Sequence, residues 1–554
     1  MDGLLTELPD DPATLKALLK QQQRTIEQQR RELDRNQRLA DRRQQQLDAA
    51  EQRVDRFREK VLRKQGQIER LEERLRRLLA HRFGRRSEQN PDQIQLFNEA
   101  ELLAALPEEP PDDGIEVPAH KRRRKKASHA LPAELPRVEV VYELDAEERY
   151  CHCGEELKRI GEEVLEQLAV IPQQYYVIRH IRPTYACSCK QCIRTATMPK
   201  QPLPATQASP QLLAQLMVNK YTDGLPLYRQ EKMAAREGLE LPRAKLARWL
   251  IDGSEVLQPL INLLVDTFFG YDIAMSDDTG IRVLKEDGRA ALSQSALWIR
   301  RGGPPDKPVV LVDYAPSKSG DTAYGLLSEF RGTLVCDGTA NFNEVVRRND
   351  LNVALCNDHA RRRFHKVCIG LGKDKAVGSI AEQGLHWYQP LYALERAIKD
   401  LSAKEKYAQR QAQVVPHWAA FIAWARRLHS EGVAHGDTRE ALSYLIHHAE
   451  GLQHYCTDGR LPISNIQSEH VAKTIAIARK NFLFADTVAG AQASGRIFSL
   501  IETARANDHH PQRYLSVVLA DLPNVTAVDQ VEALLPWNLK PEQVAERYAA
   551  FPAP

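Results

Sequence analysis

Residues 332–338 place the strongest constraint on the fold of this chain. They read Gly-Thr-Leu-Val-Cys-Asp-Gly, and the β-forming, mostly apolar residues 333–336 are typical of a short buried strand. Asp337 follows at the carboxyl end of this strand, and Gly338 permits a sharp turn. Because ligands bind at the carboxyl ends of strands in open α/β sheets, the sequence predicts a carboxylate at such a site.

Two further acids have a similar setting. Asp277 closes an expected strand at 273–276, and Glu469 lies on an expected helix. If the two strands are neighbours, the carboxylates of Asp277 and Asp337 converge. We expect no Cys or His to lie close to the three carboxylates, a set that suits Mg²⁺ or Mn²⁺. Two such ions about 4 Å apart can activate an attacking water or 3′-hydroxyl and stabilise the leaving oxygen in phosphoryl transfer.

An α/β pattern surrounds these acids. Strands are expected at 273–276, 296–300, 309–314, 333–336 and 353–356, with a helix at 322–330 before the fourth strand. This order predicts a mixed sheet with helices. Residues 375–455 are expected to be helical, with Trp387, Trp418 and Trp424 as core anchors. The helix that carries Glu469 should bury Val471, Ile475 and Ala478.

Length and charge set broad limits. A chain of 554 residues should form several domains. Its 77 basic and 74 acidic residues nearly balance, so net charge alone does not indicate nucleic acid. The sequence has no P-loop and no apolar run of membrane-spanning length. We therefore expect a soluble cytoplasmic protein without a membrane partner.

The N-terminal region predicts a coiled coil. Residues 15–81 contain no Pro and a single Gly. Apolar residues recur every seven positions, at Leu19, Ile26, Leu33, Ala40, Leu47, Val54, Val61, Ile68 and Leu75. The companion column three residues on is apolar only in its C-terminal half, so a long solvated helix remains an alternative for the first half. We favour an oligomerising helix.

Five of the nine cysteines lie between 151 and 192 and predict a zinc site. Cys189-x-x-Cys192 has the usual spacing of a zinc knuckle, and Cys151-x-Cys153 is tighter. Cys187 is either a spare or a replacement for Cys189. Four of the five should hold one structural Zn²⁺.

Two segments suggest contacts with DNA. Residues 120–126 form a basic run with Lys121, Arg122, Arg123 and Arg124, which is either a solvated charge run or a flexible arm that contacts phosphates. Residues 227–251 predict helix, tight turn and helix, and the second helix carries Arg243, Lys245 and Arg248. This pattern fits a helix-turn-helix, although spacing alone favours an ordinary helical hairpin.

Several short motifs together resemble the large subunit of the insertion-sequence-66 family of bacterial transposases, over about residues 83–537. They include Phe83-Gly84-Arg85-Arg86-Ser87-Glu88, the cysteine knuckles, Leu225-Pro226-Leu227-Tyr228-Arg229-Gln230, Asp277-Asp278-Thr279, residues 332–338, His359-Ala360-Arg361-Arg362-Arg363-Phe364, Arg479-Lys480-Asn481-Phe482-Leu483-Phe484 and Leu535-Pro536-Trp537-Asn538. The resemblance implies an RNase H-like core with an Asp-Asp-Glu (DDE) triad on Asp277, Asp337 and Glu469. It also implies DNA contacts by the motif residues Arg361, Arg362, Arg479 and Lys480.

The sequence departs from the family pattern near the acids. Asp278 stands where the family usually has Glu, Ser464 and Ile466 replace usual polar residues, and His470 replaces an Arg. The alternative reading is therefore a DNA-binding protein of transposase ancestry with weakened or lost catalysis.

The expected architecture is multidomain α+β. It comprises a coiled-coil helix (1–82), a basic and Pro-rich linker (83–135), a zinc-binding domain (136–200), a helix-turn-helix-like DNA-binding domain (201–262), an RNase H-like α/β core (263–500) with a helical insertion at about 375–455, and a C-terminal tail (501–554). The expected function is metal-dependent cleavage and transfer of DNA strands at the terminal inverted repeats of a bacterial insertion sequence. Expected partners are DNA, further copies of the chain and two small companion proteins, with a nucleoid-associated location.

Overall fold

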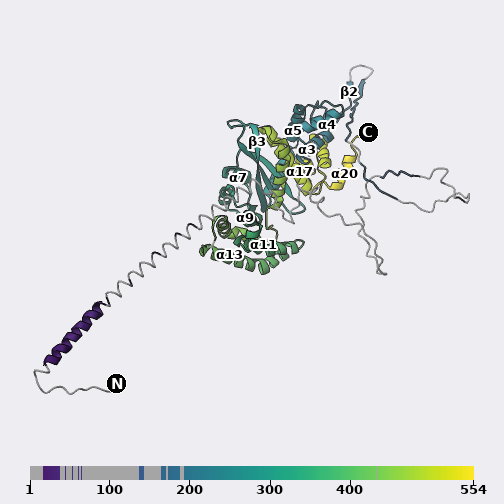
Figure 1. The fold of residues 1–554 in the computed structure, drawn as a ribbon. Helices are drawn as coiled ribbons and strands as arrows, with labels where there is room; N and C mark the ends of the chain where they lie inside the picture. The colour runs from purple at the N-terminus through teal and green to yellow at the C-terminus, as the bar shows by residue number, and fades with distance from the viewer. Residues whose placement is uncertain are drawn as a thin grey trace. The chain divides into compact units, whose positions relative to one another are not determined.

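The computed structural model describes residues 16–35, 137–142, 164–169, 173–186, 193–432 and 434–553, together with residues 37, 44, 53, 60, 64 and 152. The chain divides into two units. The larger contains residues 197–235 and 240–551 and the N-terminal helical residues 16–35, which are purple in Figure 1. The smaller contains the described parts of 87–196 with residues 236–239 and the C-terminal end.

A mixed β-sheet forms the centre of the larger unit (Figure 1). Its strands are β3 (Ile273–Lys285), β4 (Gln294–Gly302), β5 (Val309–Ala315), β6 (Thr333–Cys336), β7 (Asn352–Leu355) and β8 (Ala485–Thr487). The order is β5-β4-β3-β6-β7, and β8 pairs with the far end of β3. Strands β3, β4 and β5 form an antiparallel meander, whereas β6 and β7 run parallel to β3. The five strands expected from the sequence are confirmed. Strand β3 is longer than expected, because its pairing with β4 continues to Arg282.

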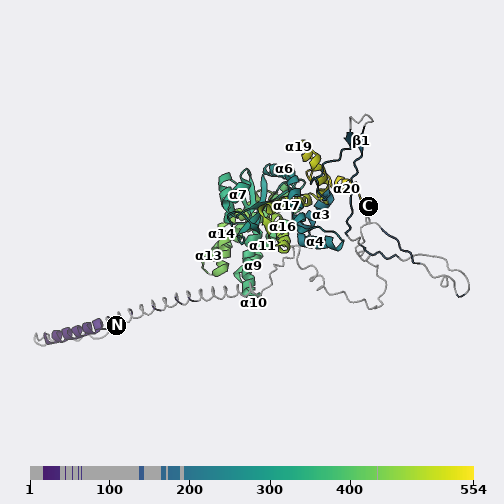
Figure 2. The same cartoon turned by 90° about the horizontal axis from the view of Figure 1, so that it is seen from above.

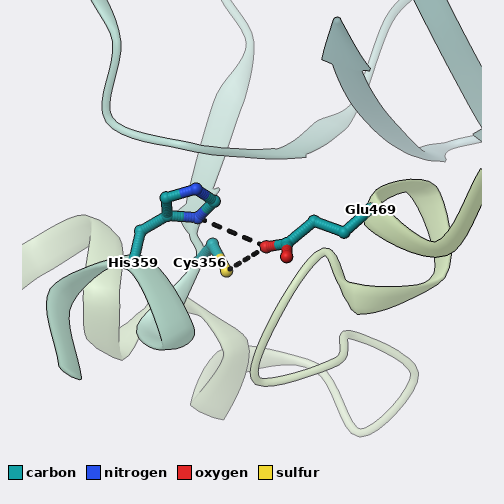
Figure 3. Close-up of side chains that lie close together, drawn as sticks. All are labelled: Cys356, His359 and Glu469. Carbon is teal, nitrogen blue, oxygen red and sulfur yellow. Dashed lines mark hydrogen bonds and ion pairs between the residues drawn. The ribbon is translucent and has the colours of Figure 1, made fainter. Parts of the chain in front are cut away.

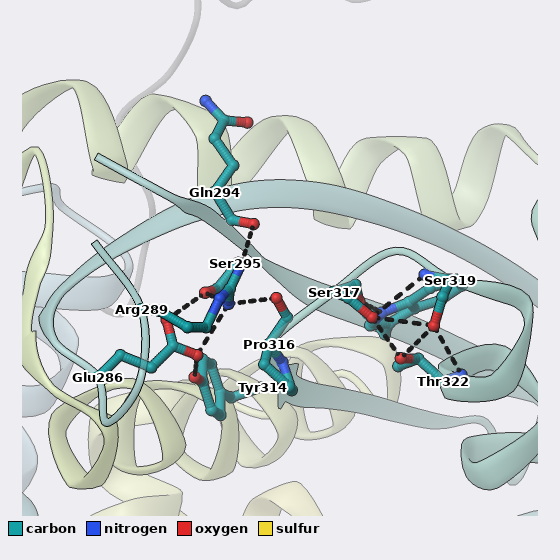
Figure 4. A network of polar contacts seen from close by, with 10 residues as sticks. Glu286, Arg289, Gln294, Ser295, Tyr314, Pro316, Ser317, Ser319 and Thr322 are labelled. Carbon is teal, nitrogen blue, oxygen red and sulfur yellow. Dashed lines mark hydrogen bonds and ion pairs between the residues drawn. The ribbon is translucent and has the colours of Figure 1, made fainter. Parts of the chain in front are cut away.

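Helix α7 (Gly320–Leu327) leads from β5 to β6. It begins two residues before the predicted helix, because the Ser319 hydroxyl accepts a hydrogen bond from the backbone N–H of Thr322 and caps the first turn. Ser317 joins the hydroxyls of Ser319 and Thr322 in the same network (Figure 4). The 3-10 turn η1 (Ala340–Phe342) and helix α8 (Asn343–Asn349) then connect β6 to β7, a stretch for which no helix was expected from the sequence.

A polar network closes the β3–β4 turn against β5 (Figure 4). The Arg289 guanidinium donates to Glu286 at 2.9 Å, to the Ser295 hydroxyl at 2.7 Å and to the carbonyl oxygen of Pro316. The hydroxyl of Tyr314, on β5, also donates to Glu286. Because the side chains of Glu286, Arg289, Ser295 and Tyr314 are half-buried or buried, their mutual hydrogen bonds avoid the penalty of unpaired polar atoms.

Helix α17 (Val488–Ala506) protects the edge strand β5. The Ser499 hydroxyl accepts the backbone N–H of Val312 at 2.8 Å, and the Thr503 hydroxyl accepts that of Val310 at 3.0 Å. Gly495 permits this close approach, because a Cβ there would collide with the Val312 carbonyl oxygen. An exposed edge strand would offer these groups to another chain, and α17 removes that hazard.

The two faces of the sheet belong to two hydrophobic cores. On β6, Leu334 and Cys336 contribute to one core and Val335 to the other, as strand alternation requires. The first core contains residues of α3 (Pro210–Tyr221), α5 (Arg243–Val256), α6 (Gln258–Phe269), α16 (Ile466–Phe482) and α17, and Leu227 of α4 (Leu227–Arg236) packs against it. Figures 1 and 2 show α3 and α17 together on this side. The Ser209 hydroxyl caps α3, as the Ser209-Pro210 sequence favours.

The second core belongs to the helical insertion. Its helices are α9 (Asn357–Leu371), α10 (Lys373–Ala376), α11 (Ile380–Ala397), α12 (Ala403–Gln409), the π-helix η2 (Arg410–Val414), α13 (Val415–Ser430), α14 (Gly436–His447), α15 (Ala449–Gln453) and the 3-10 turn η3 (His454–Thr457). Trp418 is fully buried, and Trp387 stacks on Phe421 with ring centres 5.5 Å apart. Trp424 packs against the same core, so the predicted aromatic anchors are confirmed.

The C-terminal residues are helical and packed. They form α18 (Pro511–Asp521), the 3-10 turn η4 (Leu522–Asn524), α19 (Val528–Glu532) and α20 (Pro541–Ala549). Helix α18 packs on α3 and α20. Tyr514 is fully buried, and its hydroxyl donates to the carbonyl oxygen of Leu534 at 2.8 Å. Residues named a tail on sequence grounds therefore contribute to the first core.

The smaller unit contains one described hairpin. Strands β1 (Thr184–Ala186) and β2 (Ile193–Thr195) pair antiparallel, and the Arg182 side chain donates to the carbonyl oxygen of Ala196 at 2.6 Å. The five clustered cysteines and the basic residues Lys121, Arg122, Arg123 and Arg124 lie outside the described residues. No described helix is long and apolar enough to cross a membrane.

Candidate active site at the ends of β3 and β6

Asp277 and Asp337 extend from neighbouring parallel strands. Residues Ile273 to Met275 of β3 pair with Thr333 to Val335 of β6. Asp277 lies two residues beyond that pairing, and Asp337 directly follows β6. The condition set by the sequence analysis, that the two strands are neighbours, is therefore met. Both half-buried carboxyl groups lie at the carboxyl ends of these paired segments.

Glu469 comes from a different element. It lies in the first turn of α16, and its side chain is only 8% exposed. Val471, Ile475 and Ala478 are buried on the same helix, as predicted, and α16 packs against β3 and β4. This packing fixes the first turn of α16 beside the sheet, because a helix presents residues three and four positions apart on one face.

The acids act on one another electrostatically. Burial, and after it the negative charges of Glu469, Asp337 and Asp278, together raise the pKa of Asp277 to about 7. The hydrogen bond from the backbone N–H of Asp278 to the Asp277 carboxylate, at 2.8 Å, opposes the rise. A carboxyl group held between like charges is one that a nearby cation would stabilise in its charged form.

Gly338 serves a second purpose besides the expected turn. The chain bends at Gly338, as the sequence allowed, but without a positive φ. Its Cα instead faces the hydroxyl of Tyr444, on α14, where a Cβ would collide. The Arg363 guanidinium lies 3.9 Å from the centre of the Tyr444 ring. Helix α14 thus contacts the strand end beside Asp337, whose carboxylate also accepts the Thr339 hydroxyl at 2.7 Å.

The expectation that no Cys or His lies near the carboxylates is wrong. Figure 3 shows the side chains of Cys356 and His359 pointing at Glu469. The Cys356 Sγ lies 3.7 Å and the His359 Nδ1 3.4 Å from Glu469 Oε1. Arg362 reaches the other carboxylate oxygen, Oε2, at 3.4 Å. The sequence signal was the spacing Cys356-x-x-His359 at the start of α9, which the sequence analysis did not weigh as a ligand pair.

Two other acids near β3 have separate partners. Asp278 forms an ion pair with Lys318, in the loop between β5 and α7. Asp272 lies one residue before β3 and is exposed, and its carboxylate contacts the Arg460 guanidinium at 2.8 Å. These two acids are therefore suited as controls for the three candidate site residues.

The basic residues of α5 differ in exposure. Arg243 and Arg248 are exposed, whereas Leu246, Trp249 and Leu250 are buried on the other face of the helix. Lys245 Nζ donates to Gln207 at 2.6 Å and lies 4.9 Å from the centre of the Trp249 ring. The two arginines are therefore more accessible to a ligand than the lysine.

The basic residues nearer the acids also differ. Arg361 and Arg362 are half-buried on α9, while Arg363, which was not among the predicted site residues, is exposed. On α16, Lys480 is exposed and Arg479 is half-buried against Gly280 of β3. Burial and the charge of Arg282 lower the pKa of Arg479.

Comparisons with known families agree with this organisation. The model of the IS66 transposase family matches residues 205–493, which contain the sheet, the insertion and all three candidate acids. The zinc-finger binding domain of transposase IS66 matches residues 148–190, and the IS66 C-terminal element matches 499–537. A further match, described as "Transposase C of IS166 homeodomain", covers residues 70–140.

Curated relatives extend over most of the chain. The uncharacterized protein y4jD of Sinorhizobium fredii is 30% identical over 432 residues, which cover 75% of this chain and 83% of y4jD. The uncharacterized protein y4qI of the same organism is 27% identical and covers 76% of this chain and 79% of its own length.

These matches define a class, the DNA transposases, and indicate a role in DNA binding and transposition. Within that class, the chain belongs to the IS66 transposase family. The matched domains imply the use of divalent metal ions and the presence of a zinc finger.

Proposed function

We propose that this protein cleaves DNA strands at the ends of a bacterial insertion sequence and joins them to target DNA, with Asp277, Asp337 and Glu469 as a DDE triad. The observation that carries the proposal is the placement of two acids on neighbouring parallel strands, with the third on a helix packed against the same sheet. The pKa of Asp277 responds to both other acids, which supports their action as one unit.

We further propose that the sheet is an RNase H-like core. An antiparallel meander of three strands followed by two strands parallel to the first, in the order β5-β4-β3-β6-β7, supports this assignment. The insertion enters after β7 and returns at α16, so it separates the third acid from the first two in sequence but not in the fold.

The three acids fit a pair of Mg²⁺ or Mn²⁺ ions. Their oxygen donors match hard cations, and the mutual repulsion that raises the pKa of Asp277 would be relieved by positive charge. When bound, such ions would activate the attacking oxygen and stabilise the leaving oxygen. The chain's own contribution is to hold the carboxylates: Thr339 donates to Asp337, and Arg362 pairs with Glu469.

A strand-cleavage assay on DNA that carries the terminal repeats tests this function. We expect nicked and joined products only with Mg²⁺ or Mn²⁺ present. If the folded protein binds this DNA but gives no product with either ion, the alternative is supported, namely a DNA-binding protein that has lost catalysis.

One observation favours that alternative. Asn465 precedes α16 but makes no side-chain capping bond, and both polar atoms of its buried amide lack partners within the described residues. The neighbouring Ser464 and Ile466 depart from the family pattern. Loss of the polar residues that hydrogen-bond a metal-binding acid can reduce activity about 10–100-fold.

We propose that α5 reads DNA sequence and that the basic run at 121–124 contacts phosphates. The exposed arginines on α5 support the first part. Replacing Arg243 or Arg248 with Ala should weaken binding to terminal-repeat DNA more than to random DNA. Lys245→Ala should have a smaller effect, because Lys245 already bonds Gln207. Equal losses on both DNAs would reject base reading by α5.

The basic run at 121–124 is tested by the salt dependence of DNA binding rather than by its sequence preference. Neutralising Arg122, Arg123 and Arg124 should weaken binding to all sequences and reduce its salt dependence, because fewer counterions are released. We extend the same phosphate-contact proposal to Arg361, Arg479 and Lys480. An unchanged salt dependence in the Arg122, Arg123 and Arg124 variant would reject the basic arm.

The clustered cysteines are proposed to hold one structural Zn²⁺. The matched zinc-finger segment contains Cys151, Cys153, Cys187 and Cys189 and ends before Cys192. Elemental analysis of the full chain should find zinc that survives dialysis, and a Cys151→Ser, Cys153→Ser variant should contain one zinc ion per chain fewer. An unchanged zinc content in the double variant would reject the assignment.

Residues 15–81 are proposed to oligomerise the chain as a coiled coil. Leu47→Lys with Val54→Lys should dissociate the oligomer, because unpaired charges at buried heptad positions are unfavourable. Light scattering measures the mass, and an unchanged mass would reject the proposal. We also propose that the protein works with two small companion proteins and lies in the cytoplasm, associated with the nucleoid.

A further inference from the structure

We propose that Cys356, His359 and Glu469 form a binding site for Zn²⁺ or a similar transition-metal ion, and that this ion withdraws Glu469 from the triad. The ligand site itself follows from the geometry alone. The inhibitory consequence rests on the proposed catalytic function of Glu469.

The spacing of the three donor atoms, in which the Cys356 thiol donates a hydrogen bond to Glu469, also fits a tetrahedral ion. Zinc bonds of about 2.3 Å to sulfur and about 2.0–2.2 Å to nitrogen or oxygen place tetrahedral S and O ligands about 3.5–3.7 Å apart, and N and O ligands about 3.3–3.5 Å apart. The observed distances to Glu469 Oε1 are 3.7 Å from Cys356 Sγ and 3.4 Å from His359 Nδ1. All three donor atoms lie within 4.8 Å of one another.

The fold holds these ligands on rigid elements. Cys356 follows β7, is fully buried, and donates its backbone N–H to the Cys336 carbonyl oxygen at 2.9 Å. His359 lies in the first turn of α9, three residues later, and Glu469 in the first turn of α16. Figure 3 shows the three side chains converging from these elements. Ligands on packed strands and helices need little reorganisation on metal binding.

A second observation points to a missing partner. His359 Nδ1 is buried and makes no hydrogen bond within the described part of the chain, with Glu469 as its ion-pair neighbour. Buried polar atoms normally have a partner, and a metal ion at the centre of the three donors would supply one. The His359 side chain is 29% exposed, which gives an ion a route from solvent.

The donor set selects the metal. Thiolate and imidazole ligands favour Zn²⁺ and its neighbours, whereas Mg²⁺ prefers oxygen. On binding, the Cys356 thiol loses its proton to solvent, and the ligands become a thiolate, a neutral imidazole and a carboxylate. The fourth position is left for water. Because Glu469 Oε1 belongs to this set, an ion bound here competes with the proposed triad for the same carboxylate.

Cobalt provides a probe of this site that does not depend on catalysis. The full-length chain, with its zinc finger loaded with Zn²⁺, is titrated with Co²⁺ while the thiolate-to-cobalt charge-transfer absorption is recorded. Co²⁺ should not displace zinc from the finger, because Zn²⁺ binds such ligands more tightly. We expect one additional Co²⁺ per chain with a thiolate band. That band should be absent in Cys356→Ser and retained in Cys368→Ser, a matched control on α9.

Further variants separate this site from the triad. Glu469→Gln and His359→Gln should each weaken Co²⁺ binding by at least about 10-fold, whereas Asp277→Asn should leave it unchanged. Identical spectra for the parent and folded Cys356→Ser would overturn the metal site. If Cys356→Ser does not fold, unchanged affinity in folded His359→Gln would overturn it as well. A protein without strand cleavage would refute the proposed function but leave this titration intact. Cleavage that proceeds at full rate with the Co²⁺ site filled would overturn the inhibitory role.

Discussion

Glu469 is approached by two regions of unlike chemistry. The sheet side offers Asp277 and Asp337, oxygen donors just beyond the paired segments of the parallel strands β3 and β6. The insertion side offers Cys356 and His359, sulfur and nitrogen donors at the end of β7 and the start of α9. The sheet side brings like charges together, and burial with these charges raises the pKa of Asp277 to about 7. The insertion side holds a buried thiol and an imidazole, and neither of these two groups repels Glu469 as a carboxylate does.

The difference shows how one carboxylate can belong to two possible sites. Glu469 Oε1 faces the thiol and the imidazole, while Oε2 pairs with Arg362. Under our two proposals, a hard ion would bind Glu469 together with the sheet acids, and a borderline ion would bind it together with Cys356 and His359. The variants in the following predictions each remove a side chain from one of these two regions or from their surroundings.

The largest effect should come from neutralising the sheet side or Glu469 itself. Asp277→Asn, Asp337→Asn and Glu469→Gln should each reduce strand cleavage by more than about 100-fold, since loss of an outer partner alone reduces metal-site activity about 10–100-fold. Binding to terminal-repeat DNA should remain, because the proposed DNA contacts lie on other residues. The losses should be non-additive. Parent-like cleavage by all three variants would exclude the triad.

Removing the thiol should change the response to zinc. In a cleavage assay with Mg²⁺, added Zn²⁺ should inhibit the parent, and about 10-fold more Zn²⁺ or greater should be needed for Cys356→Ser, because one ligand is lost. Each rate is compared with that of the same variant without zinc. Cys368→Ser should behave like the parent, and equal inhibition of parent and Cys356→Ser would contradict the contrast between the two sides.

The raised pKa of Asp277 on the sheet side should also make the stability of the fold depend on pH. The pKa of Asp277 is about 7 in the fold and 3.8 in an ordinary setting. The folded state therefore binds more protons between these values, and its stability should fall as pH rises through this window. Asp277→Asn removes the free-energy cost of ionising this buried carboxyl group. Without added divalent ions near pH 8, its melting temperature should exceed that of the parent, by about 2–4 °C for each kcal/mol in a medium-sized domain. A lower melting temperature would contradict the charge repulsion.

The smallest effects should come from the neighbouring acids. Asp278 pairs with Lys318 and Asp272 with Arg460. Partly exposed pairs contribute about 0–1 kcal/mol, so Asp278→Asn and Asp272→Asn should keep cleavage within about fivefold of the parent. An inactive Asp278→Asn beside an active Asp277→Asn would show that the functional register of β3 is shifted by one residue.

Much of the sheet and its helices could be read from the sequence, because the signals are local. The β-forming run at 333–336, the helix that buries Val471 and Ile475, and the aromatic residues of the insertion were predicted and are present. The short strand β8 was not predicted. Its residues, Ala485 to Thr487, have no strand pattern, and only pairing with Val283 to Lys285 makes them a strand.

The sequence by itself determined that Asp337 follows a strand, where many of the helices lie and which family the motifs resemble; Asp277, expected to close a strand, lies inside β3. Only the tertiary structure decided what surrounds those acids. Cys356 and Glu469 are 113 residues apart in the chain, and they meet because the insertion returns to the sheet at α16. In the same way, Tyr444 of the insertion, rather than backbone conformation, determines the need for glycine at 338. Periodicity and spacing describe neighbours along one element, whereas contacts between elements depend on how their buried faces pack.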